Sequence, residues 1–312
     1  MRPPVTAVRH PTVRPAVARL PTSPGVYRFR DARGAVLYIG RATDLRHRVA
    51  SYWSDLGDRR HLERMVSRIE RIEAVACDSL HEAAWLERNL LERARPRWNR
   101  MVGVEVPVYI RLDEGSHAPG LTLVHLVEAA RGVRHYGPYL GGNRLRDALS
   151  GLHRILPLAY TGTGMTGAER DMGRVRGVAA SDRGWIADAL CALLERHPDA
   201  TARARAAMAE LRDTAAAEDA FERAARIQAE ADAIEWITSP QRVTDETVAD
   251  LDAYGWAGDL LVHYAVRDGR LQQWSQRSSS QADAQHLVGQ TPDDWIPFAR
   301  RNAELAAALA LP

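Results

Sequence analysis

Two tripeptides near the front of the chain, Gly-Val-Tyr at 25–27 and Tyr-Ile-Gly at 38–40, constrain its fold more than any other feature. Apolar and polar residues alternate around them, over 26–30 and 35–39, as they do in half-buried strands. The residues between these segments, Asp-Ala-Arg-Gly at 31–34, have the composition of a tight turn. The pattern predicts a β-hairpin that carries one tyrosine on each strand.

The segment that follows the second tripeptide, residues 41–53, has helical periodicity. Arg41, Leu45, Arg48 and Tyr52 are spaced as on one face of a helix. We therefore expect this helix to present two guanidinium groups and a phenol beside the end of the second strand. Because a guanidinium is a planar fork of hydrogen-bond donors, it suits a phosphodiester.

A second helix is predicted over 80–94, where Ser79 and Glu82 have the spacing of a capping box. Glu87 falls inside the stripe that the apolar residues of this helix form, which are Leu80, Ala83, Ala84, Leu90, Leu91 and Ala94. Burying a lone carboxylate is costly unless the group is paired or binds a metal ion. Glu87 is therefore a candidate metal ligand, and Asn99 follows it by twelve residues.

Taken together, these features resemble the GIY-YIG nuclease superfamily, and in particular the N-terminal nuclease of the UvrC excinuclease family. The resemblance covers residues 21–100. It rests on the strings PGVY and LYIG, an arginine and a tyrosine ten and fourteen residues after Tyr38, the LER-NL helix, and RPRWN. It implies an α+β fold, with a small antiparallel sheet flanked by helices, and metal-dependent hydrolysis of a DNA phosphodiester.

The resemblance also implies roles for the aromatic and basic residues. Tyr27 and Tyr38 flank the scissile phosphate, and we take Tyr38 as the residue that activates the attacking water. Arg48 neutralises the phosphate, and Tyr52 positions the phosphate or the water. The alternatives are structural: the first two tyrosines can form a cross-strand pair, Tyr52 can belong to the core, and Arg48 can be a solvated helix residue.

For the remaining candidates, the resemblance implies that Glu87 binds one Mg²⁺ or Mn²⁺ and that Asn99 orders the site. Arg41 stands where UvrC-type proteins usually have lysine, so the positive charge is kept. The structural alternatives are an ion pair of Glu87 with Arg41 or Arg48, and an Asn99 that closes the turn after Pro96.

Charge is distributed unevenly along the chain, whose 42 basic residues are all arginine. Residues 1–100 hold 20 arginines and 11 acidic residues, whereas residues 101–312 have a net charge of −7. The basic part is the nuclease-like part, as expected of a surface that contacts DNA, unless the asymmetry arose by chance. The chain has no apolar run long enough to span a membrane and no signal-peptide core, so we expect a cytoplasmic protein.

The regions next to the nuclease-like segment are less specific. Residues 1–20, rich in arginine and proline, are predicted to be a disordered basic tail. Residues 101–160 continue the UvrC-like pattern with strands and a helix, and their YGPY string resembles the family's FGPY turn. Residues 161–184 read as a linker. UvrC proteins carry four cysteines there, implied to hold an iron–sulfur cluster, and this chain has none in that stretch, so we expect no cluster of that kind.

The last two regions complete the predicted organisation. Residues 185–238 read as helical and include a hairpin whose Phe221-Glu222-Arg223-Ala224-Ala225 resembles the core of the UVR motif. This resemblance implies a UvrB-like partner; the alternative is an alanine-rich hairpin used for packing. Residues 239–312 read as a small C-terminal α/β region with no RNase H-like nuclease, as in the short UvrC homologues of the Cho type.

The sequence thus favours an endonuclease that cuts one phosphodiester on the 3′ side of a lesion in double-stranded damaged DNA, within nucleotide excision repair. Binding is expected to be dominated by the DNA backbone. Two alternatives remain open: a nuclease directed to branches or flaps, and a DNA-binding adaptor without catalytic activity.

Overall fold

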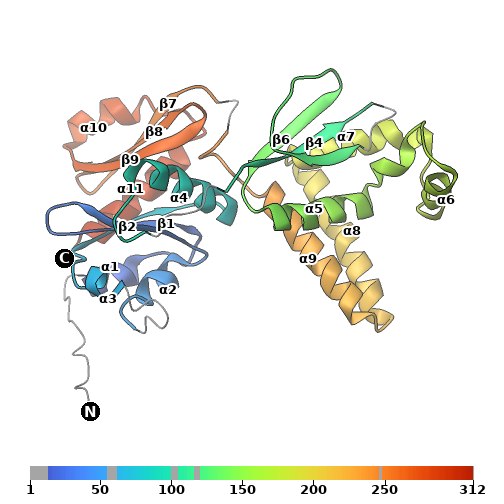
Figure 1. Ribbon diagram of the computed structural model, residues 1–312. Coiled ribbons are helices and arrows are strands. Elements are labelled where there is room, and N and C mark those ends of the chain that lie inside the picture. The colour runs from blue at the N-terminus through green and yellow to red at the C-terminus, as the bar shows by residue number, and fades with distance from the viewer. Residues whose placement is uncertain (1–12, 55–61, 100–104, 116–119, 246–247, 312) are drawn as a thin grey trace, which may run out of the picture. The chain divides into compact units, whose positions relative to one another are not determined.

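The chain forms two compact units (Figure 1). The computed structural model describes residues 13–54, 62–99, 105–115, 120–245 and 248–311. Unit 1 combines residues 1–103 with residues 240–312, and unit 2 comprises residues 104–239. Both units contain helices and antiparallel strands, so the predicted α+β class is confirmed.

The first sheet of unit 1 contains the predicted hairpin. Its strands are β1 (Gly25–Arg30), β2 (Val36–Ala42) and β3 (Arg71–Ala76), in the order β2-β1-β3, and all are antiparallel. The turn forms because the Asp31 carboxylate accepts hydrogen bonds from the backbone N–H groups of Arg33 and Ala35. The alternation of the sequence therefore predicted this element correctly.

Short helices cover the first sheet: α1 (Val13–Arg19), α2 (Leu45–Ala50), α3 (Glu63–Val66) and the longer α4 (Leu80–Ala94). Leu20, directly after α1, is fully buried in the same core as Phe29 and Leu45. The prediction of a disordered tail over 1–20 is therefore wrong for residues 13–20, because that segment buries apolar side chains. Residues 1–12 lie outside the described part of the chain.

The C-terminal part of the chain belongs to unit 1. It forms a meander of β7 (Leu251–Ala257), β8 (Leu260–Arg267) and β9 (Arg270–Ser278), followed by α10 (Gln281–Val288) and α11 (Ile296–Ala310). Helix α11 packs against β7 and β8 and also against β3 of the first sheet. The prediction that residues 239–312 form a separate region is therefore wrong, because residues 240–312 share one unit with the nuclease-like segment.

Two contacts explain how α11 joins the sheets. The fully buried Asn302 accepts a hydrogen bond from the Ala76 N–H at 2.7 Å and donates to the Ala76 carbonyl at 3.1 Å, so it satisfies backbone groups at the end of β3. On the other side, Gly255 of β7 lies directly against the helix. A Cβ atom at Gly255 would lie 2.0 Å from the Ala299 carbonyl oxygen.

Unit 2 contains a second small sheet and a set of helices. Its elements are β4 (Val108–Asp113), β5 (Leu121–Val124), β6 (Val133–Tyr139), α5 (Gly142–Ile155), α6 (Gly167–Val175), α7 (Arg183–Leu194), α8 (Pro198–Ala217) and α9 (Phe221–Thr238), with the short 3-10 turns η2 (Leu158–Thr161) and η3 (Ala180–Asp182). Helices α8 and α9 form the predicted hairpin. The YGPY string lies in β6 rather than in a turn.

The fold of unit 2 differs from the predicted division of its sequence into separate regions and a linker. The predicted linker over 161–184 contains α6, which begins at a capping box between Thr166 and Glu169. Side chains from both flanking regions share one core, as Ile110, Leu152, Ile186 and Ile227 show. Residues 105–160 and 185–238, which were predicted to lie in separate regions, are therefore parts of one unit.

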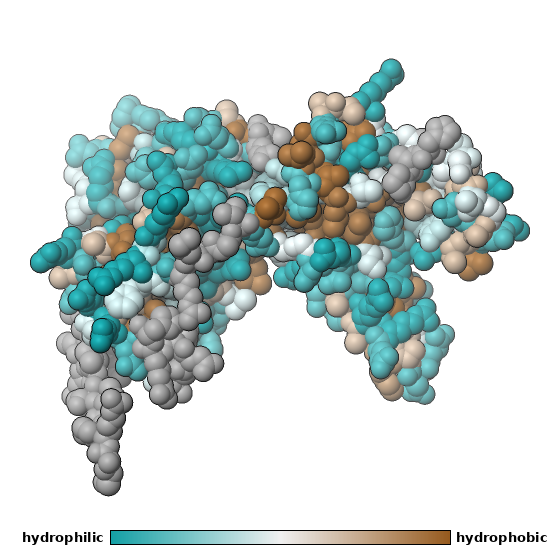
Figure 2. All heavy atoms as spheres, in the orientation of Figure 1, coloured by the Kyte–Doolittle hydropathy of each residue, from teal (hydrophilic) through white to brown (hydrophobic). Residues whose placement is uncertain are grey.

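Several apolar side chains of unit 2 are exposed. Val106, Leu126 and Val127 are each more than half exposed. Figure 2 shows apolar side chains gathered on the visible face of this unit.

The close approach at Gly255 gives a test of the unit 1 architecture. Gly255→Ala should lower the free energy of unfolding by about 1–3 kcal/mol, because the added methyl group forces α11 away from β7. Urea denaturation measures this loss. Gly289→Ala is the matched control, since its Cβ would lie no closer than 3.4 Å to a neighbouring atom. Equal stability of both variants would contradict the packing described here.

Candidate active site

The strand register explains the two glycine-tyrosine tripeptides. Tyr27 of β1 lies opposite Gly40, and Phe29 lies opposite Tyr38. A Cβ atom at Gly40 would lie 2.5 Å from the Tyr27 hydroxyl oxygen, so glycine leaves the space that this phenol occupies. The two tyrosines are therefore not directly paired across the strands, although their ring centroids are 6.2 Å apart.

Tyr52 completes a group of three phenols. Its hydroxyl lies 2.8 Å from the Tyr27 hydroxyl, and its ring centroid lies 6.1 Å from that of Tyr38. Tyr27 and Tyr52 are buried, whereas Tyr38 is only half-buried and reaches the surface. Tyr38 is thus the member of the group that a solvent molecule or a substrate can contact.

Two aromatic residues that the sequence analysis did not single out pack against these phenols. Phe29 lies 5.1 Å from Tyr52 and 6.2 Å from Tyr38, measured between ring centroids, and Trp53 lies 6.0 Å from Phe29. Phe29 was detectable in principle, because it is two residues after Tyr27 on one strand and so faces the same side of the sheet. Its ring helps to fix the positions of the phenols.

The helix predicted over 41–53 is shorter than expected. β2 continues through Arg41 to Ala42, and α2 begins at Leu45 because the Asp44 carboxylate caps it by accepting from the His47 N–H at 2.8 Å. Arg41 therefore lies on a strand, and Tyr52 follows the end of the helix. The prediction of one helical face is wrong, yet Arg48 and Tyr52 still meet beside β2.

Arg48 lies on α2 with its guanidinium carbon 5.9 Å from the Tyr52 ring centroid. The side chain is half-buried. Its Nε–H is buried and has no hydrogen-bond partner among the residues that the structure describes. The guanidinium also hydrogen-bonds to the Tyr27 side chain, and its planar fork of donors suits an anionic ligand.

Glu87 reaches the end of β2 from helix α4. Its carboxylate accepts a hydrogen bond from the Arg41 N–H at 3.2 Å and lies 3.3 Å from the Arg41 Nε. Burial raises the pKa of Glu87, and the Arg41 charge and N–H and the Arg48 charge oppose this rise. The structure thus brings Glu87, Arg48 and Tyr38 together, and it contains the Glu87–Arg41 ion pair that was one of the alternatives.

Asn99 fixes the strand that carries Tyr38. Its side chain accepts from the Ile39 N–H at 3.0 Å and donates to the Ile39 carbonyl at 2.7 Å. Its own N–H donates to the Pro96 carbonyl at 3.1 Å, so it also closes the turn after α4. The ordering role and the turn role proposed from the sequence are therefore compatible in this geometry.

The donor set at Glu87 is compatible with one hard divalent cation. No group of three or more His, Cys, Asp or Glu side chains able to hold a metal ion is found in the described ranges. Mg²⁺ commonly keeps several waters and is held by one or two carboxylates together with substrate phosphates. A single carboxylate whose side chain is 22% exposed, beside a guanidinium suited to a phosphate, fits that mode of binding.

The three phenols are neutral at physiological pH. Burial raises the pKa of Tyr27 to about 12, with Tyr38 adding to the rise and Tyr52 and Arg48 opposing it. Burial also raises the pKa of Tyr38 and of Tyr52 well above the usual tyrosine range. A tyrosinate is therefore not available in the resting site.

Comparison with known proteins gives one matching family model. Residues 23–100 match the model of the UvrC-like GIY-YIG domain. Among curated proteins, the chain is 31% identical over 288 residues to UvrABC system protein C of Nocardia farcinica, which covers 83% of this chain and 41% of that protein. The corresponding protein of Geobacter metallireducens is 36% identical over 143 residues, covering 45% of this chain and 23% of that protein. The chain thus spans less than half the length of these relatives.

Solved structures also match a part of the chain. The GIY-YIG N-terminal endonuclease domain of UvrC from Thermotoga maritima, solved with its catalytic magnesium ion, is 29% identical. It covers 30% of this chain and 100% of the solved chain, with a TM-score of 0.27.

The buried phenols predict a specific dependence of stability on pH. A phenol with a pKa raised from 10.0 to about 12 stabilises the folded state fully below pH 10, and this contribution is lost as the pH rises to about 12. At pH 8, Tyr27→Phe should lower the free energy of unfolding by about 1 kcal/mol, because the hydrogen bond to Tyr52 is lost.

Above pH 10 the wild-type protein should lose stability faster than the variant, so the difference between them should narrow. Urea denaturation at several pH values between 8 and 12, followed by near-UV circular dichroism, measures both curves. A constant difference over this range would contradict a buried phenol at position 27.

Proposed function

Residues 23–100 belong to the family of UvrC-like GIY-YIG domains, and from this premise we propose that the protein is a metal-dependent DNA endonuclease that hydrolyses one phosphodiester. The observation that carries the proposal is the convergence of Tyr38, Arg48 and Glu87 beside the end of β2. Phosphodiester hydrolysis needs a positioned water, a donor for the phosphoryl oxygens and compensation of developing charge. These three side chains can supply those three functions.

In the proposed reaction, water attacks phosphorus and the bond to the 3′-oxygen breaks, leaving a 5′-phosphate and a 3′-hydroxyl. The Arg48 guanidinium holds a non-bridging phosphoryl oxygen and neutralises its charge as the transition state forms. Glu87 would hold one Mg²⁺ or Mn²⁺, which when bound polarises the phosphoryl oxygen and stabilises the leaving oxygen. Arg41 neutralises Glu87 in the resting protein and adds positive charge at the edge of the site.

Tyr38 is the proposed acceptor for the proton of the attacking water, because it is the phenol of the group that reaches the surface. Since its pKa is raised by burial, it acts as a neutral hydroxyl and must release its own proton as it accepts one. That proton passes to the solvent that Tyr38 reaches, while the Tyr52 hydroxyl, bonded in turn to Tyr27, orients the Tyr38 hydroxyl. Asn99 keeps Tyr38 in place through its two bonds to Ile39.

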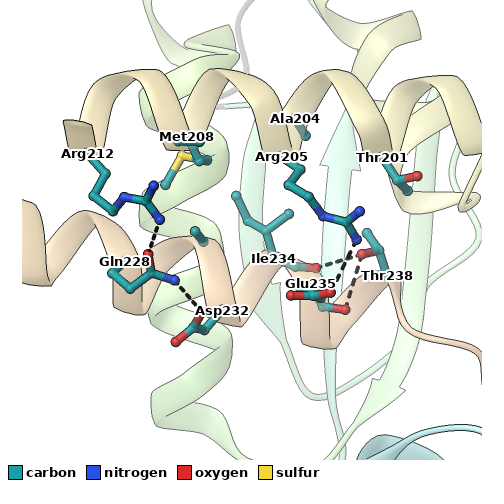
Figure 3. A pocket seen from close by; sticks show the side chains of 12 residues that line it. Thr201, Ala204, Arg205, Met208, Arg212, Gln228, Asp232, Ile234, Glu235 and Thr238 are labelled. Atoms are coloured by element: carbon teal, nitrogen blue, oxygen red, sulfur yellow. Dashed lines mark hydrogen bonds and ion pairs between the residues drawn. The ribbon is translucent and has the colours of Figure 1, made fainter. Parts of the chain in front are cut away.

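The proposed substrate is double-stranded damaged DNA, with the cut on the 3′ side of the lesion. The described residues assigned to the site act on the phosphate and the cation rather than on the bases, so we propose that a UvrB-like protein supplies the targeting. Helices α8 and α9 form a cavity of about 220 Å³ lined by the pairs Arg205–Glu235 and Arg212–Gln228 (Figure 3). The hairpin packs into the core of unit 2 through residues such as Ile227, while Phe221, at the start of α9, is 66% exposed, so we propose that this exposed end of the hairpin docks the partner.

The proposed location is the cytoplasm, where the DNA substrate and the repair partner are found. In the described part of the chain, no helix combines the length and the apolar character needed to cross a bilayer.

A comparison of two variants on one helix tests the proposed activity. With Mg²⁺ or Mn²⁺, a lesion-bearing duplex and a UvrA–UvrB loader, Glu87→Ala should reduce the nicking rate by at least about 100-fold, as expected when transition-state charge loses its compensation. Glu92→Ala is the matched control, because Glu92 lies on the exposed part of α4 and pairs with Arg88. Gel analysis of end-labelled DNA measures the rate and the position of the cut.

The same assay separates the alternatives. Nicking of flap or branched DNA without the loader would replace the repair assignment with a structure-specific nuclease. Absence of metal-dependent cutting on every substrate would point to the adaptor.

Phe221→Ser should lose loader-dependent nicking while it keeps the melting temperature of the wild-type protein. Full nicking by this variant would contradict the docking role of the hairpin.

A further inference from the structure

Helix α4 is held on two opposite sides. Glu87 points toward β2, and Asn89 is two residues further along a helix of about 3.6 residues per turn, so it faces nearly the opposite way. Asn89 is 3% exposed, and its amide nitrogen donates to the Thr244 hydroxyl at 3.0 Å and to the Val243 carbonyl at 3.3 Å. The side of α4 that faces away from the candidate site is thus bonded to a segment that lies about 150 residues further along the chain.

The start of α4 makes contacts of the same kind. The Glu82 carboxylate is completely buried and accepts from the Arg242 N–H at 3.1 Å. The Ser79 hydroxyl donates to the Pro240 carbonyl at 2.6 Å. Residues 240–244, which we call the anchoring segment, therefore bond to the N-cap Ser79 and to two positions on α4, Glu82 and Asn89.

The anchoring segment is itself fixed to the C-terminal sheet. The Leu271 N–H donates to the Val243 carbonyl at 2.7 Å, and Thr244 forms an antiparallel bridge with Arg270. Further along α4, Arg93 donates to the Gln272 side chain at 2.8 Å. The position of the helix is therefore coupled to β9 rather than to the first sheet alone.

By contrast, Glu87 has a weak hold on β2. Its bond to the Arg41 N–H is long, at 3.2 Å, and the Arg41 side chain of the ion pair is 52% exposed. Exposed ion pairs contribute little to stability. The contacts on the site side therefore do not by themselves define where the carboxylate lies.

We propose that the anchoring segment is a positioning element that sets, through Asn89 and Thr244, where α4 places the Glu87 carboxylate beside β2. The inference rests on the proposed role of Glu87 as the metal ligand. Functional groups must be held within a fraction of an ångström by a supporting shell, and here that shell comes from the other end of the chain.

A pair of threonine variants tests this role. Thr244→Val keeps the shape of the side chain but removes the hydroxyl that Asn89 uses. Thr291→Val is the matched control: Thr291 is also buried in the C-terminal part, and its hydroxyl makes two bonds, both to the Tyr254 backbone. The full-length protein is used throughout.

The role is tested by one readout with metal and one without, and DNA affinity in the absence of metal is the control. Calorimetric titration with Mn²⁺ should give a dissociation constant about fivefold higher for Thr244→Val, the size expected from losing one buried hydrogen bond, and an unchanged one for Thr291→Val. Hydrogen exchange without metal should be faster for the α4 backbone amides in Thr244→Val alone. Affinity for DNA in the absence of metal should not change in either variant.

Unchanged α4 exchange and unchanged Mn²⁺ affinity in a folded Thr244→Val variant would overturn the positioning role, as would equal effects in both threonine variants. If Thr244→Val does not fold, Gln272→Ala serves instead, since it removes the partly exposed contact with Arg93 and should weaken Mn²⁺ binding by about twofold. A different pattern would show that the proposed metal-binding role of Glu87 is wrong while the positioning role holds. In that case Glu87→Ala would bind Mn²⁺ like the wild-type protein, and hydrogen exchange of α4 would still be faster in Thr244→Val.

Discussion

The packing of α4 against the end of β2 is the constraint on which the site depends. Within this packing the Glu87 carboxylate accepts a hydrogen bond from the Arg41 N–H of β2. The packing also brings the carboxylate within electrostatic reach of Tyr38, on the same strand, and of Arg48, on the next helix. Burial raises the pKa of Glu87 because the charged carboxylate has lost part of its hydration. A cation bound in place of that water would stabilise the charged form.

The rest of unit 1 holds α4 in place on the side that faces away from the site. The first half of α4 is buried on every side, with Trp85 and Glu82 both inaccessible to solvent. A helix that is buried all round needs partners on two faces. The first sheet provides one of them, and residues 240–312 provide the other, through Arg242, Thr244 and β9.

Local signals were enough to predict much of this arrangement. The hairpin follows from alternation around a turn, and α4 begins at Ser79, whose hydroxyl accepts from the Glu82 N–H as the capping spacing predicted. The side chains placed together by the motif spacing also lie together in the structure, although Arg41 is on a strand and Tyr52 follows a helix. The spacing between motif residues therefore predicted which side chains lie close together more reliably than it predicted their secondary structure.

Long-range packing could not be predicted in the same way. The apolar stripe of α4 omitted Trp85 and Asn89 because their partners lie about 150 to 185 residues further along the chain. The same reason applies to the tail, where Leu20 is buried only because a complete core exists to receive it. The predicted linker over 161–184 lacks a strong apolar pattern, and its helix α6 depends on a cap rather than on a buried face.

The most direct test of the account is the location of the cation. Crystals of the full-length protein soaked in Mn²⁺ and measured at the manganese absorption edge should give an anomalous peak within about 2.2 Å of a Glu87 carboxylate oxygen, on the side that faces Arg48 and Tyr38. A Glu87 carboxylate that stays on Arg41 with no ion beside it, or a peak bound only by other side chains, would contradict the proposed metal site.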